Sequence, residues 1–144
     1  MPPSNDPIAA MLARYQAAVL EKSADDLLAL YDHDVRVFDA WGRWACEGLQ
    51  AWSGMAREWF DSLGQERVEV RSEEVRASLE GNTATAHGIL VYTALDPTGM
   101  RLRSLRNRFT WVLRRGEGGW RIVHEHTSVP LDFETKSMLR PDAA

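Results

Sequence analysis

An aspartate and a tyrosine are the residues of this sequence best suited to proton chemistry. Asp39 ends a short alternating stretch at residues 35–40, and Tyr15 lies on the apolar stripe of the first predicted helix. If both face one apolar cavity, burial raises the pKa of the carboxylate and strengthens a hydrogen bond from the phenol. Such a pair can move a proton next to a carbonyl group. The alternative is structural, with Tyr15 in the core and Asp39 capping the turn that follows it.

A second set of polar residues lies in a predicted β-hairpin at residues 101–130, which turns at the glycine-rich segment 116–119. A two-residue turn flanked by Gly116 and Gly119 pairs Thr110 with Glu125. Arg108 then lies diagonally across from Glu125. These two side chains can form a buried ion pair or hold an anionic ligand. An ion pair on a solvated sheet is the alternative.

In this register the hairpin has two different faces, because side chains alternate along a strand. The aromatic face carries Phe109, Trp111, Ile122 and His124, and the mixed face carries Arg108, Thr110, Val112, Val123 and Glu125. Neither face is suited to open water. We therefore expect a helical layer on one side, a cavity, and a second subunit on the other side. Hydropathy alone places the aromatic face in the interior.

The histidines do not predict a metal site. His124 and His126 have the spacing of a two-histidine metal grip, but no third ligand is near them in the sequence. We expect packed, hydrogen-bonded histidines and no metal. His87 shares the phase of Ile89 and Val91, so it either lines the cavity or ends a core. No glycine-rich phosphate loop is present, and we expect no cofactor.

The remaining elements follow from apolar periodicity and from capping residues. Helices are expected at residues 7–21, 24–31 and 49–63, and strands at 35–40, 68–79 and 83–94. The alternation slips by one residue at 72–74, which predicts a β-bulge that bends the strand. Helices followed by a strongly curved, mostly antiparallel sheet predict an α+β roll, with three N-terminal helices closing the mouth of a cone.

Composition limits the function further. The chain has 144 residues, 44% of them hydrophobic, which suits one domain with a real core. The net charge of -4 argues against a general nucleic-acid or anionic-membrane binder. A single cysteine excludes an internal disulfide, and neither a signal peptide nor a membrane span is evident. We expect a soluble, cytoplasmic protein.

Two stretches resemble ketosteroid isomerase, a member of the cone-shaped superfamily that includes nuclear transport factor two and the SnoaL-like polyketide cyclases. They are residues 13–15 and residues 31–42 with Gly48 beyond. The resemblance implies that Tyr15 is an oxyanion hydrogen-bond donor and Asp39 the general base. Ketosteroid isomerase is itself the well-known case of a neutral carboxylic acid beside such a donor. The resemblance also places this acid near Thr110, where the strand has Arg108 and no acid.

The closing hairpin is similar to the association domain of calcium/calmodulin-dependent protein kinase II. Residues 114–115, 119–120 and 123–128 carry the similarity, together with Pro130. That domain is an oligomerising module with arginines inside its pocket. Both resemblances place the mixed hairpin face inside the cone, and the aromatic face against a partner subunit. They cover most of the chain and imply one SnoaL-like domain over residues 1–144, ordered at about 7–130 with a tail at 132–144.

These interpretations give one main hypothesis and one alternative. The main hypothesis is a homodimeric SnoaL-like protein that binds a small, acidic organic ligand as an isomerase, cyclase or dehydratase without a cofactor. Asp39 is the expected base, and Tyr15 and Arg108 stabilise charge. The expected pocket walls are Trp41, Trp59, His87, Thr110 and Glu125. The alternative is a non-catalytic binding or oligomerisation module.

Overall fold

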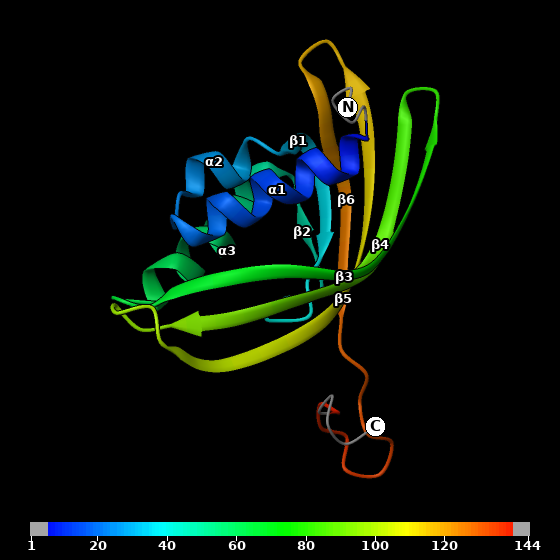
Figure 1. The fold of residues 1–144 in the computed structure, drawn as a ribbon. Coiled ribbons are helices and arrows are strands. Elements are labelled where there is room, and N and C mark those ends of the chain that lie inside the picture. Colours follow the sequence, from blue (N-terminus) through cyan, green and yellow to red (C-terminus); the bar gives the residue numbers. More distant parts are fainter. Residues whose placement is uncertain (1–5, 140–144) are drawn as a thin grey trace.

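The computed structural model describes residues 6–139, which form three helices and one six-stranded sheet (Figure 1). The helices are α1 (Pro7–Leu20), α2 (Ala24–Leu28) and α3 (Leu49–Ser62). The strands are β1 (Tyr31–Phe38), β2 (Cys46–Glu47), β3 (Arg67–Glu80), β4 (Thr83–Leu95), β5 (Arg101–Gly116) and β6 (Gly119–Ser128). Their order is β2-β1-β6-β5-β4-β3, and only β1 and β6 pair in parallel. The predicted α+β roll is confirmed.

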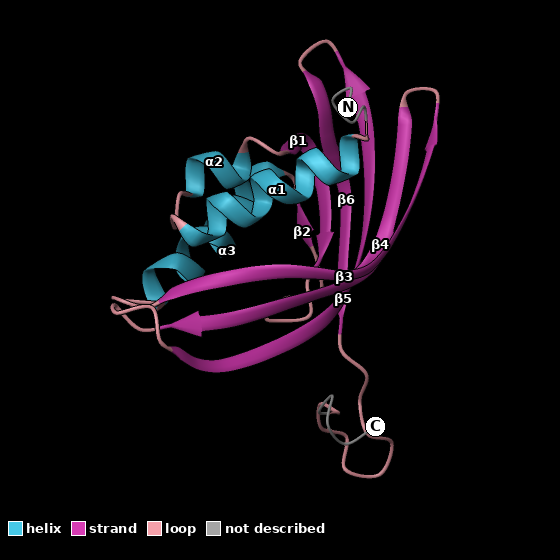
Figure 2. Cartoon of the chain, in the orientation of Figure 1, coloured by secondary structure: helices cyan, strands magenta, loops and turns pink. Residues whose placement is uncertain are grey.

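All three helices lie on the concave side of the sheet (Figure 2). The predicted start of α1 is confirmed, because the Asp6 carboxylate accepts a hydrogen bond from the Ile8 amide at 2.9 Å and Pro7 follows it. Ser23 caps α2 in the same way. The second helix is shorter than predicted, since Tyr31 opens β1 and does not continue the helical stripe.

The predicted β-bulge in β3 is confirmed, and it lies where β3, β4 and β5 bend in Figure 1. The register against β4 shifts between Glu73 and Arg76, and Glu74 between them has a φ of 53°. The bulge packs against the bare backbone of Gly88 in β4. A Cβ atom at Gly88 would lie 3.0 Å from the Glu73 carbonyl oxygen and 3.0 Å from the Val75 Cα. The curvature of the sheet therefore depends on this close contact between backbones.

The β5–β6 hairpin turns where the sequence predicts, but its register differs from the prediction. Gly116 pairs with Gly119, as expected, and Leu113 pairs with Ile122. Beyond that pair β6 contains one extra residue, Val123, so the register shifts by one.

This shift moves Glu125 to the other face of the hairpin. Glu125 lies opposite Trp111, and the predicted pairing of Glu125 with Thr110 is wrong. Phe109 and Trp111 are buried in the core of their own chain together with Glu125 and Thr127. The prediction that Phe109, Trp111 and Ile122 pack against a partner subunit is therefore wrong as well.

The chain continues past β6 as an extension that leaves the sheet (Figure 1). Its residues form a hydrogen-bonded turn, in which the Asp132 amide donates to the Ser137 carbonyl at 2.7 Å and the Leu139 amide donates to the Pro130 carbonyl at 2.8 Å. Residues 140–144 of the predicted tail lie outside the described residues. Within residues 6–139, no helix is both long enough and apolar enough to cross a membrane.

The bulge contact predicts opposite effects for two glycine substitutions. Gly88→Ala should lower the free energy of unfolding by about 1 to 3 kcal/mol, because the new methyl group must displace the backbone of β3. Gly54→Ala is the matched control. Gly54 lies within α3, and a Cβ added there would have no atom within 4 Å, so alanine should stabilise the fold by about 0.5 to 1 kcal/mol. Urea denaturation measures both, and a stabilising Gly88→Ala would contradict the proposed contact.

Candidate functional site

A cavity of about 640 Å³ lies between the helices and the curved sheet. Five of the residues predicted for the site line it, namely Tyr15, Asp39, Trp41, Trp59 and Glu125. Further walls come from α3, from β4 and from the first half of β5, including Trp52, Tyr92, Arg103 and Asn107. The lining is mostly aromatic and apolar, with a few polar groups, which is typical of a small-molecule site.

Three residues predicted for the site do not line this cavity. Arg108 and Thr110 are exposed on the outer face of β5, where the Arg108 Nε donates a hydrogen bond to the Ser128 hydroxyl at 3.1 Å. His87 is exposed on the outer face of β4, because the buried phase of that strand is the one of Ala86. The prediction that these three side chains face the cavity is wrong. For Arg108 and Thr110 it assumed a hairpin without a bulge, and for His87 it assumed that Ile89 and Val91 mark the inward phase of β4.

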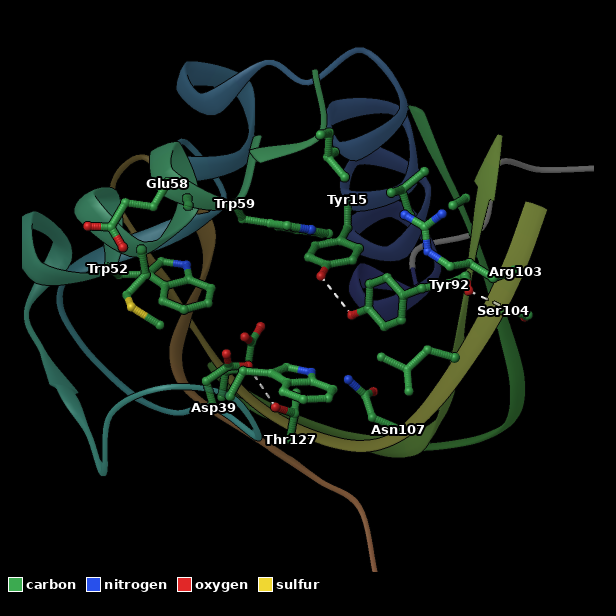
Figure 3. A pocket seen from close by; sticks show the side chains of 18 residues that line it. Tyr15, Asp39, Trp52, Glu58, Trp59, Tyr92, Arg103, Ser104, Asn107 and Thr127 are labelled. Carbon is green, nitrogen blue, oxygen red and sulfur yellow. Dashed lines mark hydrogen bonds between the residues drawn. The ribbon is translucent and has the colours of Figure 1, made fainter. Parts of the chain in front are cut away.

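Asp39 follows β1 and is fixed by the neighbouring strand β6. The Thr127 hydroxyl donates to Asp39 Oδ1 at 2.9 Å and itself accepts the Ala40 amide at 2.8 Å. Figure 3 shows Asp39 and Thr127 joined at the floor of the cavity. Burial raises the pKa of the Asp39 carboxyl, and the hydrogen bonds from Thr127 and from the backbone of Trp41 and Ala40 oppose that rise. The carboxylate is thus made more basic but remains hydrogen-bonded.

Glu125 is the most deeply buried acid of the site, with 3% of its surface exposed. Its Oε1 accepts two hydrogen bonds, from the Tyr31 hydroxyl at 2.7 Å and from the Trp111 indole nitrogen at 2.8 Å. Burial raises the pKa of Glu125 to about 7, while these two hydrogen bonds lower it and the charge of Asp39 raises it. Glu125 therefore keeps its proton at a pH where an ordinary glutamate has lost it.

Two phenols from different elements meet on another side of the cavity. The hydroxyl groups of Tyr15 in α1 and Tyr92 in β4 lie 2.9 Å apart, within the ring of side chains seen in Figure 3. Burial is the main cause of the raised pKa of Tyr15, and the neighbouring Tyr92, Tyr31 and Glu125 raise it further. Burial also raises the pKa of Tyr92. Both phenols stay protonated, so one of them donates to the other and one proton remains for a ligand.

Asn107 in β5 adds an amide to this group. It is 6% exposed, and its Oδ1 has no hydrogen-bond partner within the described part of the chain. A hydrogen bond from the Asn107 side chain also lowers the pKa of Tyr92. Asn107 therefore extends the polar group formed by Tyr15 and Tyr92, and it leaves one acceptor without a donor.

The charged residues near the rim do not provide a free cation. Arg103 contributes to the cavity wall, but its guanidinium is hydrogen-bonded to the Glu66 carboxylate. Glu58 is the other charged residue at the rim. The described lining therefore contains three acidic side chains and one arginine that is already paired. Among residues 6–139, no group of three or more histidine, cysteine or acidic side chains is placed to hold a metal ion.

Several residues of the site could not be identified from the sequence. Tyr31 falls within the predicted helix at 24–31, and the cavity-lining Tyr92 and Asn107 carry no motif. The sequence signal for Tyr92 is its phase, because Tyr92 lies on the same face of β4 as the buried residues Leu90 and Ala94. The resemblance places the second acid of the site on β5. The second buried acid is instead Glu125 of β6, which the sequence predicts as a pocket wall and which lies directly opposite Trp111.

The comparisons with known proteins agree with this fold. A family model described as a SnoaL-like domain matches residues 8–132. No curated protein matches the chain at a significant level. Among solved structures, an NTF2-like protein of unknown function from Pseudomonas putida is 24% identical with a TM-score of 0.81, over 93% of this chain and 92% of that one.

Two further solved structures share the fold at lower identity. One, from Xanthomonas campestris, is provisionally assigned as a calcium/calmodulin-dependent protein kinase II association domain; it is 18% identical, with a TM-score of 0.69, over 89% of this chain and 90% of that one. The other is provisionally assigned as an aromatic ring hydroxylase from Novosphingobium aromaticivorans. It is 19% identical, with a TM-score of 0.66, over 93% of this chain and 87% of that one. At these identities the likeness concerns the fold.

Burial of Glu125 predicts a specific dependence of stability on pH. The folded protein keeps this proton up to about pH 7, whereas the unfolded chain releases it near the ordinary value of 4.5. Between these values the folded state binds more protons, so this residue makes the free energy of unfolding fall as the pH rises. Glu125→Gln removes the titration and preserves an acceptor for Tyr31 and Trp111. Its stability relative to the wild type should therefore increase by roughly 3 kcal/mol between about pH 4 and about pH 8.

Denaturant titrations at several pH values measure this difference. Glu117→Gln, at the exposed tip of the hairpin, is the control, and its stability relative to the wild type should change far less with pH. A stability difference between Glu125→Gln and the wild type that does not vary with pH would show that Glu125 titrates normally.

Proposed function

Because the chain belongs to the SnoaL-like domain family, we propose that it binds a small uncharged organic molecule in this cavity and moves a proton next to the carbonyl group of that molecule. The reaction needs no cofactor in this proposal. The observation that supports it best is the presence of the Asp39 carboxylate and the Tyr15 phenol in the wall of one aromatic cavity. A base and a hydrogen-bond donor in one such space are the two groups that enolisation requires.

Asp39 is the proposed base. Its raised pKa makes the carboxylate a stronger base than a solvated aspartate, and the hydrogen bond from Thr127 fixes one of its two oxygens. The proton taken from the carbon next to the carbonyl goes to the carboxylate. The electron pair of that C–H bond then moves toward the carbonyl oxygen, which becomes an enolate.

The proposed donors to this oxygen are the paired phenols Tyr15 and Tyr92. They take the part that the sequence predicts for Arg108, which lies on the outer face. Buried phenols that stay protonated can hydrogen-bond a developing oxyanion without introducing a charge into the cavity. Such donors are most effective where water is excluded.

The preference for an uncharged ligand follows from the charges of the lining. The expectation of an acidic ligand depended on Arg108 inside the cavity. In the structure the arginine of the lining is Arg103, which is paired with Glu66, and Asp39 and Glu125 line the same space. An anion would enter beside two carboxyl groups without a free counter-charge, which is unfavourable in a medium of low polarity.

Replacement of the base gives the direct test of this function. Asp39→Asn should slow hydrogen–deuterium exchange at the carbons next to the carbonyl of benzylacetone by about 100-fold or more, because an amide cannot take the proton. Its affinity for the ketone, followed by tryptophan fluorescence, should not change. Asp34→Asn is the matched control, since Asp34 is exposed on β1. Equal exchange rates in the wild type and in Asp39→Asn would exclude Asp39 as the base.

We also propose that the outer face of the sheet is a homodimer contact. No described helix covers this face (Figure 2). Phe38 of β1 lies there between the rings of His124 and His126, at centroid distances of 5.1 and 5.4 Å. The Arg36 guanidinium lies 4.7 Å from the centroid of the Phe38 ring. The similar Xanthomonas campestris protein is provisionally assigned as an association domain, which supports a second copy as the partner. A pure assembly function remains the alternative to catalysis.

A charge at this cluster should separate the subunits. In light scattering, the wild type is expected to have the mass of a dimer and His126→Glu the mass of a monomer. His126 is exposed on this face, so a two-fold contact would bring the two introduced glutamates close together, where their charges repel. Leu131→Glu, on the extension after β6, is the control and should stay dimeric. A monomeric wild type at micromolar concentration would contradict the proposed contact.

A further inference from the structure

The cavity is lined by two neighbouring carboxyl groups, Asp39 just after β1 and Glu125 in the adjacent strand β6. Glu125 and Thr127 are two residues apart in β6 and both point inward, and Thr127 holds Asp39 by a hydrogen bond. Two residues along a strand span roughly 7 Å, so the carboxyl groups of Asp39 and Glu125 are neighbours. The charge of Asp39 also acts on Glu125. The family model and the similar structures assign no role to this pair.

The two carboxyl groups have opposite surroundings. Asp39 is half-buried and accepts hydrogen bonds from a hydroxyl and from the backbone, which favour its ionised form. Glu125 is nearly inaccessible, and burial outweighs the hydrogen bonds from Tyr31 and Trp111 that favour its ionised form. Tyr15 and Tyr92, the other titratable groups that act on this region, stay protonated. At neutral pH the site therefore contains one carboxylate and, in much of the population, one carboxylic acid.

The hydrogen bonds of Glu125 leave one of its oxygens open to a ligand. Tyr31 and Trp111 both donate to Oε1. Since Glu125 also lines the cavity, Oε2 is the oxygen that can present its proton to a ligand. The fully buried Tyr31 and Trp111 side chains hold the carboxyl group in one orientation. A fixed acid beside a fixed base is the arrangement that enzymes use to act on two neighbouring atoms.

We propose that Asp39 and Glu125 together remove water from an uncharged β-hydroxy ketone, with Asp39 as the base and Glu125 as the acid. This inference rests on the proposed function and narrows it from proton transfer in general to elimination. An isomerase can return the abstracted proton with the same base. Hydroxide, by contrast, is a poor leaving group that needs a proton from a second group, and Glu125 supplies one.

The elimination is balanced within these two residues. Asp39 takes the proton from the carbon between the carbonyl and the hydroxyl-bearing carbon, and that C–H pair becomes the new carbon–carbon double bond. The C–O bond breaks, and its electron pair accepts the Glu125 proton to give water. The products are an α,β-unsaturated ketone and water, with Asp39 protonated and Glu125 ionised. The proton then returns from Asp39 to Glu125, which holds it more firmly, and no oxidant or reductant takes part.

Two related ketones make it possible to test elimination separately from the proton abstraction of the proposed function. The aldol of benzaldehyde and acetone loses water to give benzylideneacetone, which is followed by its ultraviolet absorbance. Benzylacetone lacks the hydroxyl group and reports proton abstraction alone, through deuterium exchange. The wild type should accelerate both reactions. Glu125→Gln should slow elimination by about 100-fold more than it slows the exchange, while Glu117→Gln should resemble the wild type in both.

The possible outcomes are distinct. Exchange without elimination in the wild type would overturn the inference and leave the proposed function standing. Elimination at the wild-type rate in Glu125→Gln would overturn it too, and so would an equal loss of both reactions, which would make Glu125 a structural group. If the wild type catalyses neither reaction, the inference and the proposed function both fail. Circular dichroism and the denaturation midpoint of Glu125→Gln establish that the variant is folded.

Discussion

One extra residue in β6 determines which side chains reach the interior of this protein. Val123 has no partner in β5, and from that point onward the residues of β6 have the opposite phase from an unbroken hairpin. The shift brings Glu125 opposite Trp111 and Thr127 opposite Phe109, all of them inside. Without it, an inward Trp111 would leave Glu125 on the outer face, and neither a buried acid nor an anchor for Asp39 would exist. A local feature of one strand thus creates the polar part of the cavity.

The buried carboxyl group of Glu125 is compatible with the fold because the core supplies it with partners. Tyr31 and Trp111 are fully buried aromatic residues whose polar atoms need an acceptor, and the Glu125 carboxyl satisfies both. The same burial keeps this acid protonated in much of the population near neutral pH, while Asp39, which is closer to solvent, ionises more easily. The interaction that completes the core therefore also separates the proton affinities of the two carboxyl groups. Structure and proposed chemistry depend on the same contacts.

Much of the fold could be predicted from local patterns, because caps, apolar periodicity and turn glycines act over a few residues. The start of α1 at Pro7, the β3 bulge and the turn between Gly116 and Gly119 are examples. The β6 bulge could not be predicted in this way, since Ile122 and Val123 are both apolar and fit either register. Hydropathy alone indicates the correct face of β5, and the resemblance indicates the correct orientation of Glu125. A hairpin without a bulge cannot satisfy both, and for that reason the sequence prediction puts Arg108 inside.

The proposed chemistry requires Asp39 and Glu125 to differ in protonation state within one cavity. Carbon-13 NMR of protein labelled at its glutamate and aspartate carboxyl carbons, titrated with pH and assigned with Glu125→Gln and Asp39→Asn, tests it directly. The Glu125 signal should titrate at about pH 7, and the Asp39 signal should titrate below it. A Glu125 carboxyl that ionises at the pKa of an ordinary solvated glutamate, or together with Asp39, would contradict the proposed division into acid and base.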